Sequence, residues 1–291
     1  MHKPNMVFFG TPPFAVSILE ALKKEDLLPK LIVTAPDTPQ GRGLVLTPPA
    51  VKVWADAHNI PTIQPASLTQ TIPEELTTSS WDFFIVAAYG KILPQTLLDL
   101  PTHGTLNVHP SLLPQYRGAS PIEGQILNDA PEIGVTIMLM DAKLDHGPIL
   151  LQEILTPPSW PLTKDRLTDL FAHTGGVLLV ETIHGILDET ITPQPQDHAQ
   201  ATFTGKIEKK DGEITLADNP YQNYLKYCAY HPWPGTFFFA QKNGKEVRIK
   251  IADAEYIDNS FLPRFVIPEG KQKISWEDFQ KAGYELGIKS S

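Results

Sequence analysis

Residues 82–88 read Asp-Phe-Phe-Ile-Val-Ala-Ala, and this stretch decides the fold class. Its apolar residues follow one another directly, whereas a half-exposed strand would have a polar residue at every second position. A strand that is apolar on both faces is typical of a parallel sheet covered by helices on both sides. We therefore predict a strand here, inside an open, mostly parallel α/β sheet.

Segments on either side of this stretch repeat the alternation of strand and helix patterns. This order predicts a Rossmann-like sheet, in which ligands bind beyond the carboxyl ends of the strands. Further predicted strands cover residues 6–10, 30–34, 104–109, 135–140 and 149–154, the last two forming a pair. The predicted helices begin at Pro12-Pro13 and cover residues 49–58, 119–128 and 162–188, the last being interrupted near residues 175–176.

The chain changes character after residue 188, which predicts a division into domains. Residues 1–188 carry the α/β pattern, and residues 189–205 are rich in Thr, Pro and Gln, as is typical of a linker. Residues 206–291 predict a small β-rich module. Its predicted strands are residues 235–240, 246–251 and 264–267, and a capping box at residues 275–278 begins a short helix.

Composition and charge exclude several classes of protein. The 291 residues carry a net charge of −9, which argues against a generic nucleic-acid binder. The acidic excess lies wholly in residues 1–202, which hold 11 basic and 21 acidic residues, whereas residues 203–291 hold 13 basic and 12 acidic residues. Cys228 is the only cysteine, so a disulfide within the chain is excluded and a cysteine-based zinc site is not expected. The sequence shows neither a membrane-spanning run nor a signal peptide, and a cytoplasmic protein is expected.

Three polar residues have the chemistry that acyl transfer to an amine requires. Asn107 and His109 are two apart on a predicted strand, so their side chains share one face at the strand's end. The Asn107 amide can donate to a carbonyl oxygen that becomes negative, and His109 can carry protons near neutral pH. Asp145 can stabilise the cationic imidazole. No covalent nucleophile is needed, and Ser111, next to Pro110, is expected to shape the backbone.

The surrounding residues resemble the folate-dependent formyltransferases. Residues 107–114 read Asn-Val-His-Pro-Ser-Leu-Leu-Pro, and they are followed by Tyr-Arg-Gly at 116–118 and Asp-His-Gly at 145–147. Further segments resemble the family members that act on initiator tRNA. They are Gly-Thr-Pro-Pro-Phe-Ala at 10–15, Gly-Arg-Gly at 41–43, Ala-Tyr-Gly-Lys-Ile-Leu-Pro at 88–94 and His-Pro-Trp-Pro-Gly at 231–235.

The resemblance covers nearly the whole chain and implies a reaction. A formyl group passes from 10-formyltetrahydrofolate to the amino group of methionine on initiator methionyl-tRNA, for translation initiation, and Asn107, His109 and Asp145 carry the transfer. The resemblance also implies that the protein is a monomer, that it needs no metal, and that it binds neither DNA nor a membrane. The residues implied to contact the folate are Ala88, Tyr89, Gly90, Ile92, Leu93, Ser111, Leu112, Leu113, Pro114, Asp141, Leu144 and Gly147. Those implied to contact the tRNA or its methionyl end are Gly10, Thr11, Phe14, Arg42, Lys206, Lys209 and Lys210.

Three departures from the family pattern leave the acceptor open. Residues 44–46 read Leu-Val-Leu where the family commonly has lysines, so they form an apolar wedge or pack on the protein. Lys143 replaces a glycine and carries strain if that position needs a positive φ. The resemblance also implies that residues 206–291 form an OB-like module that binds tRNA, and this module is shorter than is usual in the family. The alternatives are an N-formyltransferase acting on a nucleotide-linked amino sugar, a hydrolase that releases formate from the folate, and a folate- or tRNA-binding protein without catalysis.

Overall fold

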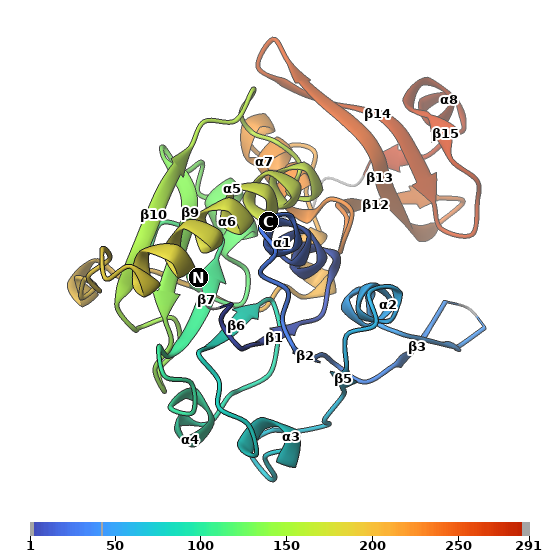
Figure 1. The fold of residues 1–291 in the computed structure, drawn as a ribbon. Coiled ribbons are helices and arrows are strands. Elements are labelled where there is room, and N and C mark those ends of the chain that lie inside the picture. The colour runs from blue at the N-terminus through green and yellow to red at the C-terminus, as the bar shows by residue number, and fades with distance from the viewer. Residues whose placement is uncertain (1–2, 42, 287–291) are drawn as a thin grey trace. The chain divides into compact units, whose positions relative to one another are not determined.

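The computed structural model describes residues 3–41 and 43–286, which divide into two compact units (Figure 1). The first unit contains the chain up to Gly118 together with Glu132–Thr156 and Thr168–Phe203. The second contains Ala119–Pro131, Pro157–Leu167 and the chain from Thr204 onward. The division drawn from the sequence at residues 188 and 206 stays a prediction, and the second unit takes two segments from before it.

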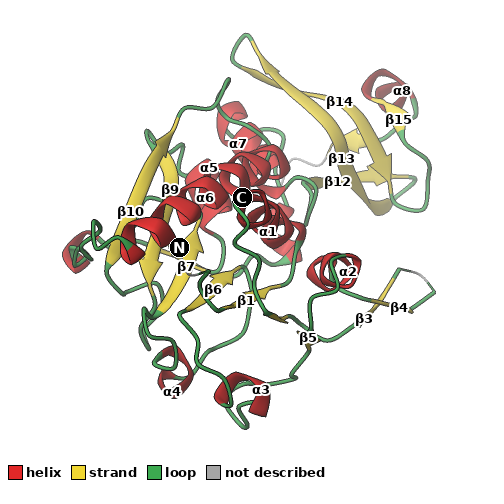
Figure 2. Ribbon diagram, viewed as in Figure 1, coloured by secondary structure: helices red, strands yellow, loops and turns green. Residues whose placement is uncertain are grey.

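The first unit is built on a seven-stranded sheet in the order β10-β9-β7-β6-β1-β2-β5 (Figure 2). Five strands are parallel, while β9 is antiparallel to both of its neighbours, which confirms the predicted mostly parallel α/β sheet. The parallel strands are β1 (Met6–Gly10), β2 (Leu31–Val33), β5 (Thr62–Ile63), β6 (Phe83–Ala87) and β7 (Thr105–His109). The antiparallel pair is β9 (Ile133–Leu139) and β10 (Ile149–Leu155).

Strand β6 is buried along its whole length, as its uninterrupted apolar sequence predicts. Phe84 and Val86 join a core cluster with Leu76 of α3 and Leu97 of α4 on one face of the sheet. Alternate residues of a strand point to opposite faces, so Ile85 faces the other helical layer. The helices of this unit are α1 (Pro13–Lys24), α2 (Ala50–Ala57), α3 (Glu74–Thr77), α4 (Gln95–Leu98) and α6 (Lys164–Leu187), the last of which begins before Thr168.

Helix α6 runs unbroken over 24 residues, so the predicted interruption near residues 175–176 is wrong. A Cβ atom on Gly175 would lie 2.7 Å from Cγ1 of Val108, and one on Gly176 would lie 2.6 Å from Cβ of Ala21. The two glycines therefore do not end the helix. They let it approach both the sheet and α1 more closely than any other residue would allow.

Among the described residues, α6 is the one helix long and apolar enough to cross a membrane by length and composition alone. The core helix of a folded domain passes the same test. Phe171, Leu179 and Ile183 of this helix are fully buried inside the protein. The apolar sequence of α6 is thus accounted for by the core that it covers.

The second unit has a five-stranded antiparallel sheet in the order β15-β14-β13-β12-β16. Asn243-Gly244 and Asp258-Asn259 turn the two long hairpins with positive φ at both residues, as two-residue hairpin loops require. Ser275 accepts a hydrogen bond from the Asp278 backbone, which confirms the predicted cap of α8. The strands are β12 (Phe237–Lys242), β13 (Lys245–Ile257), β14 (Ser260–Pro268), β15 (Ile274–Ser275) and β16 (Glu285–Leu286). The helices are α5 (Pro121–Leu127), α7 (Pro220–Tyr230) and α8 (Trp276–Lys281).

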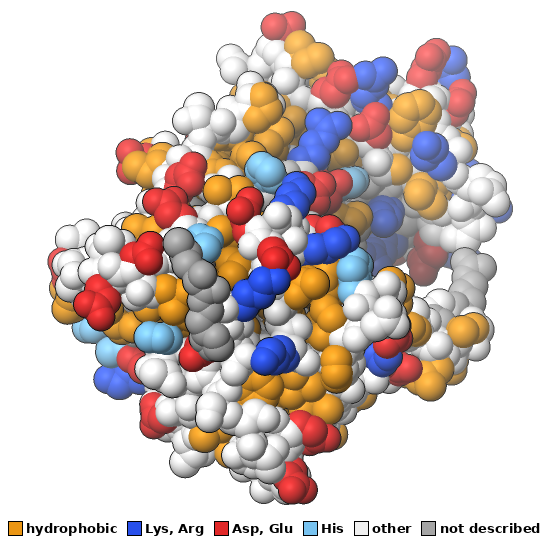
Figure 3. All heavy atoms as spheres, viewed as in Figure 1, with side chains coloured by type: hydrophobic (Ala, Val, Ile, Leu, Met, Phe, Trp, Pro, Cys, Tyr) orange, Lys and Arg blue, Asp and Glu red, His pale blue; other side chains and the backbone are white. Residues whose placement is uncertain are grey.

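The remaining elements are short. A hairpin of β3 (Thr38–Gln40) and β4 (Val45–Thr47) follows β2, and β8 (Arg117–Gly118) pairs with β11 (Phe203–Thr204). Two single 3-10 turns lie at His198–Gln200 and Lys209–Gly212. On the face shown in Figure 3, acidic and basic side chains are interspersed with apolar ones.

The close approach of α6 to the sheet predicts the effect of adding a side chain at Gly175. We expect Gly175→Val to lower the free energy of unfolding by about 1–3 kcal/mol, because the new side chain would meet Val108, whose branched side chain cannot easily move aside. Gly205→Val serves as the control, since a Cβ there meets nothing within 4 Å. Thermal and denaturant unfolding of both variants measure this. Equal stability of the two would contradict the packing argument.

Candidate active site

The predicted catalytic residues lie where the central strands of the first unit meet. In the sheet register, Asn107 of β7 is opposite Val86 of β6, and Gly10 of β1 is opposite Ala87. The loop after β1 also contacts the loop after β6, because the Thr11 hydroxyl donates to the Tyr89 carbonyl at 3.3 Å. The carboxyl ends of three parallel strands therefore form one site, as predicted for such a sheet.

His109 is held in one tautomer by its surroundings. The residue is 4% exposed, and Nε2 lies 3.2 Å from the Tyr116 carbonyl, which can only accept, so Nε2 carries the proton. Nδ1 then has a free lone pair and lies 3.8 Å from Oδ1 of Asp145. Burial lowers the pKa of His109, and Arg117 acts in the same direction, while Asp145 and the Tyr116 carbonyl oppose them. The imidazole is therefore neutral at neutral pH and able to accept a proton.

Asp145 is aimed at this imidazole by a left-handed backbone conformation, with φ at +47°. Asp tolerates that region better than most residues, although it still stores some strain there. Oδ2 accepts a hydrogen bond from the Gly118 backbone at 2.7 Å, which leaves Oδ1 facing His109. Two acceptors 3.8 Å apart can share one donor group between them, such as an amine or a water.

The Asn107 side chain is 9% exposed and forms no hydrogen bond within residues 3–41 and 43–286. The amide is therefore available to donate a hydrogen bond to a ligand. Its position two residues before His109 on β7 gives both side chains the same face. The arrangement can hold a carbonyl oxygen beside a proton acceptor.

Gln196 ties this site together, although the sequence predicts only a linker around it. Its Oε1 accepts from Nε and Nη2 of Arg117 at 3.2 and 2.6 Å. Its Nε2 donates to the carbonyls of Asp145 and Gly147 at 3.0 and 2.6 Å. The amide thus uses all of its hydrogen-bonding capacity inside a site where it is 6% exposed. No pattern in residues 189–205 distinguishes this glutamine from its neighbours.

Arg117 also donates to Nδ1 of His198 at 2.9 Å, and that ring stacks on His146 with centroids 4.0 Å apart. His146 in turn donates to Asp141 at 2.7 Å. Desolvation lowers the pKa of His198, and the nearby His146, Arg117 and Lys143 charges act in the same direction. His198 is therefore neutral and accepts from the guanidinium.

The loop implied to hold the folate has an unusual backbone. Ala88 and Gly90 have φ values of +49° and +79°, so the chain turns sharply after β6. Tyr89 and Leu93 are buried, whereas Ile92 is 77% exposed. Burial raises the pKa of Tyr89 to about 12, so the phenol stays neutral. The loop presents backbone groups and one apolar side chain to solvent.

The second implied folate loop, residues 141–147, is shaped by Asp141 and Gly147. Oδ1 of Asp141 accepts from the Lys143 backbone at 2.9 Å, and Leu144 is 63% exposed. Lys143 does not have a positive φ, so the strain predicted for it is absent. A Cβ on Gly147 would lie 2.0 Å from the Leu139 carbonyl, which only glycine can avoid.

Ser111 shapes the segment after β7, as expected. Its hydroxyl donates to the Gln115 carbonyl at 2.6 Å, and its own carbonyl accepts from Thr136 at 2.6 Å. The Thr136 hydroxyl also accepts from the Leu113 backbone. Leu112 and Pro114, on either side of Leu113, are partly exposed, so part of this segment remains accessible.

The residues predicted to contact tRNA lie apart in the two units. Phe14 is buried in α1, and Arg42 falls outside the described residues. Leu44 and Val45 are 72% and 67% exposed beside β3, so they do not pack on the protein. In the second unit, the predicted phosphate contacts are all exposed, and Lys210 forms an ion pair with Glu208. These contacts are Lys206, Lys209 and Lys210.

Comparison with known proteins identifies the chain's relatives. Residues 4–183 match the formyl transferase family model. A methionyl-tRNA formyltransferase of Chloroflexus aurantiacus is 41% identical over 265 residues, which cover 90% of this chain and 84% of that protein. One of Desulfotalea psychrophila is 40% identical over 313 residues, covering 99% and 96%. The chain belongs to the formyl transferase family. Within it, the chain groups with the methionyl-tRNA formyltransferases.

Solved structures show the same fold at lower sequence identity. A methionyl-tRNA formyltransferase from Clostridium thermocellum has a TM-score of 0.58 at 15% identity, covering 94% of this chain and 99% of that one. An N-formyltransferase from Helicobacter canadensis, in complex with folinic acid and dTDP-3-aminofucose, has a TM-score of 0.62 at 18% identity, covering 94% and 99%. At such identities the likeness extends to the fold alone.

The lowered pKa of His109 predicts the pH dependence of the reaction. A proton acceptor with a pKa below its usual 6.5 loses activity only when the pH falls below that value, so we expect the acid limb of kcat to lie below pH 6.5. His109→Ala should lower kcat by ~100-fold or more and remove this limb. The exposed His184→Ala is the control. An acid limb above pH 6.5 would contradict the neutral imidazole.

The hydrogen bonds of Gln196 predict a positioning role. Gln196→Glu keeps acceptors for Arg117 but loses both donors to the Asp145 loop, and we expect kcat to fall by about 10- to 100-fold with little change in KM. Gln194→Glu, in an exposed position of the same segment, should leave kcat unchanged. Unfolding is measured alongside. A lower melting temperature with normal kcat would show that Gln196 only stabilises the fold.

Proposed function

We propose that this chain transfers the formyl group of 10-formyltetrahydrofolate to the amino group of methionine on initiator methionyl-tRNA. The observation that carries the proposal is the neutral His109 facing Asp145, beside an Asn107 amide that has no hydrogen-bond partner among the described residues. This pair lies in a chain about 40% identical to methionyl-tRNA formyltransferases over nearly its whole length. The geometry of the site supports the transfer of a formyl group to an amine, and the relatives support methionyl-tRNA as the acceptor.

The amino-sugar alternative receives less support. The structures of sugar N-formyltransferases resemble this chain at 16–18% identity, which extends to the fold alone. The relatives at about 40% identity, which match the chain in both units, are named for methionyl-tRNA. The shared fold explains why both kinds of enzyme can use the same carboxyl edge of the sheet.

The formyl donor has a place on the two loops that border the site. Residues 88–93 and 141–147 present backbone groups near Asn107 and Asp145, and such groups can hydrogen-bond a pterin. Ile92 and Leu144 are exposed apolar side chains on these loops, which suit a flat aromatic ring. The donor would thus be held mainly by backbone contacts and apolar surface.

The transfer itself needs an oxyanion donor and a proton carrier. The amino group attacks the formyl carbon, a new C–N bond forms, and the carbonyl oxygen becomes negative. Asn107 is placed to donate to that oxygen; losing such a donor typically costs ~3–4 kcal/mol of barrier. The amine proton passes to Nδ1 of His109, and Asp145 stabilises the imidazolium. The proton then goes to the departing nitrogen of the folate as its bond to the formyl carbon breaks.

The cellular setting follows from the acceptor. A charged initiator tRNA is found where translation occurs, so we propose a cytoplasmic enzyme that acts without a membrane partner. The formyl donor already carries an activated carbonyl, and the proposed steps use no metal. We also propose that the enzyme acts as a monomer, since each residue of the transfer comes from one chain.

The reaction is tested with purified protein, 10-formyltetrahydrofolate and initiator tRNA charged with methionine. We expect formyl-methionine to accumulate, and Asp145→Asn to lower turnover by ~100-fold or more because the imidazolium loses its counter-charge. Nucleotide-linked amino sugars are offered in parallel. Formylation of a sugar, with no formyl-methionine above background at micromolar enzyme, would establish the alternative.

A further inference from the structure

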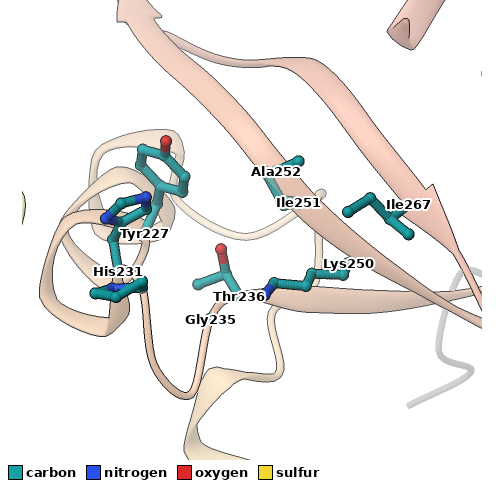
Figure 4. A pocket seen from close by; sticks show the side chains of 9 residues that line it. Tyr227, His231, Gly235, Thr236, Lys250, Ile251, Ala252 and Ile267 are labelled. Carbon is teal, nitrogen blue, oxygen red and sulfur yellow. The ribbon is translucent and has the colours of Figure 1, made fainter. Parts of the chain in front are cut away.

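The second unit contains a cavity of about 130 Å³ that the transfer reaction does not use (Figure 4). It lies between the end of α7 and strands β13 and β14, with Tyr227 and His231 on one side and Ile267 on the other. By the same measure, one water needs only ~10–15 Å³. The cavity is therefore large enough for a chemical group of several atoms.

A threonine hydroxyl in the cavity wall is without a partner. Thr236 is 1% exposed, and its Oγ1 forms no hydrogen bond within the part of the chain that the structure describes. Its backbone carbonyl is satisfied, because it accepts from the Ile251 backbone at 2.9 Å. A buried hydroxyl without a partner costs free energy that a valine of the same shape would not. Its presence is explained if a ligand completes the hydrogen bond.

A lysine reaches the same place. Lys250 lies across Gly235, where a Cβ atom would be 3.4 Å from Nζ and 2.9 Å from Cε, so the end of the lysine side chain passes close to this glycine. Figure 4 shows its ammonium group directed toward Gly235 and Thr236. Within residues 3–41 and 43–286, no carboxylate pairs with this ammonium.

The other polar groups at the cavity are already engaged. His231 contacts Oδ1 of Asp165 through Nδ1 at 3.2 Å. Burial raises the pKa of Tyr227 to about 12, and hydrogen bonds with Asp253 and the Ala254 backbone engage its hydroxyl. The phenol is thus neutral and adds no negative charge. Among the residues that the structure describes, the cavity combines an ammonium group without a carboxylate partner, a hydroxyl without a hydrogen-bond partner and apolar walls.

We propose that this cavity binds one backbone phosphate of the RNA acceptor, with Lys250 and Thr236 as its ligands. An ammonium and a hydroxyl are common partners of phosphate oxygens in nucleic-acid complexes. The apolar wall at Ile267 suits the sugar carbons next to the phosphate. The assignment rests on the proposed tRNA acceptor, which supplies the only polyphosphate partner of the reaction.

The test measures binding of uncharged initiator tRNA to the full chain, without a formyl donor, at several salt concentrations. Lys250→Gln should weaken binding and reduce the slope of log affinity against log salt by about 0.7–0.9, the value for one lost phosphate contact. Thr236→Val should weaken binding by about 2- to 10-fold, through one lost hydrogen bond, without lowering the melting temperature. Lys271→Gln, an exposed lysine outside the cavity, is the control.

Two outcomes would overturn the assignment. One is a salt slope for Lys250→Gln equal to that of Lys271→Gln, together with normal RNA affinity for Thr236→Val. The other is binding of inorganic phosphate that disappears in Lys250→Gln while RNA affinity is unchanged, which would give the cavity to a free phosphate compound. Because no formyl transfer is measured, failure of the proposed reaction would be seen separately, in the formylation assay.

Discussion

The side-chain amide of Gln196 is the contact on which the site depends. It joins Arg117 to the loop that carries Asp145. The residues on either side of Arg117 hold the proposed catalytic pair: the Tyr116 carbonyl accepts from His109, and the Gly118 amide donates to Asp145. Both members of the imidazole–carboxylate pair are therefore positioned through one buried residue. A buried polar network of this kind is stable only when every group is paired, so the pair is fixed as a unit.

The sheet imposes a second constraint, because β7 carries the proposed catalytic residues on one face and packs against a helix on the other. Val108 lies between Asn107 and His109 and points to the opposite face, where Gly175 of α6 contacts it. The missing side chain at Gly175 brings the helix close to β7. A rigid strand between two packed layers keeps the amide and the imidazole in fixed relative positions.

The sequence predicts the strands well because burial on both faces leaves a plain signal, as at residues 82–88. It also places Asn107 and His109 on one face of a strand, which follows from strand geometry, and it points to Asp145 through the resemblance; the catalytic roles of the three residues stay predictions. It misses Gln196, since a hydrogen bond across 79 residues to Arg117 leaves no local pattern. It misjudges Gly175, because a glycine that serves close packing looks the same as one that ends a helix.

The buried imidazole also explains why acceptor recognition must lie elsewhere. Burial is the main cause of the lowered pKa of His109, and the phosphates of an RNA cannot enter such a water-poor site without a large desolvation cost. Residues 1–202 are moreover net negative and repel a polyanion, whereas residues 203–291 are nearly balanced. Only the uncharged amine needs to reach β7. Affinity for the rest of the acceptor then depends on contacts such as the one proposed for Lys250, which lies far in sequence from the proposed catalytic residues.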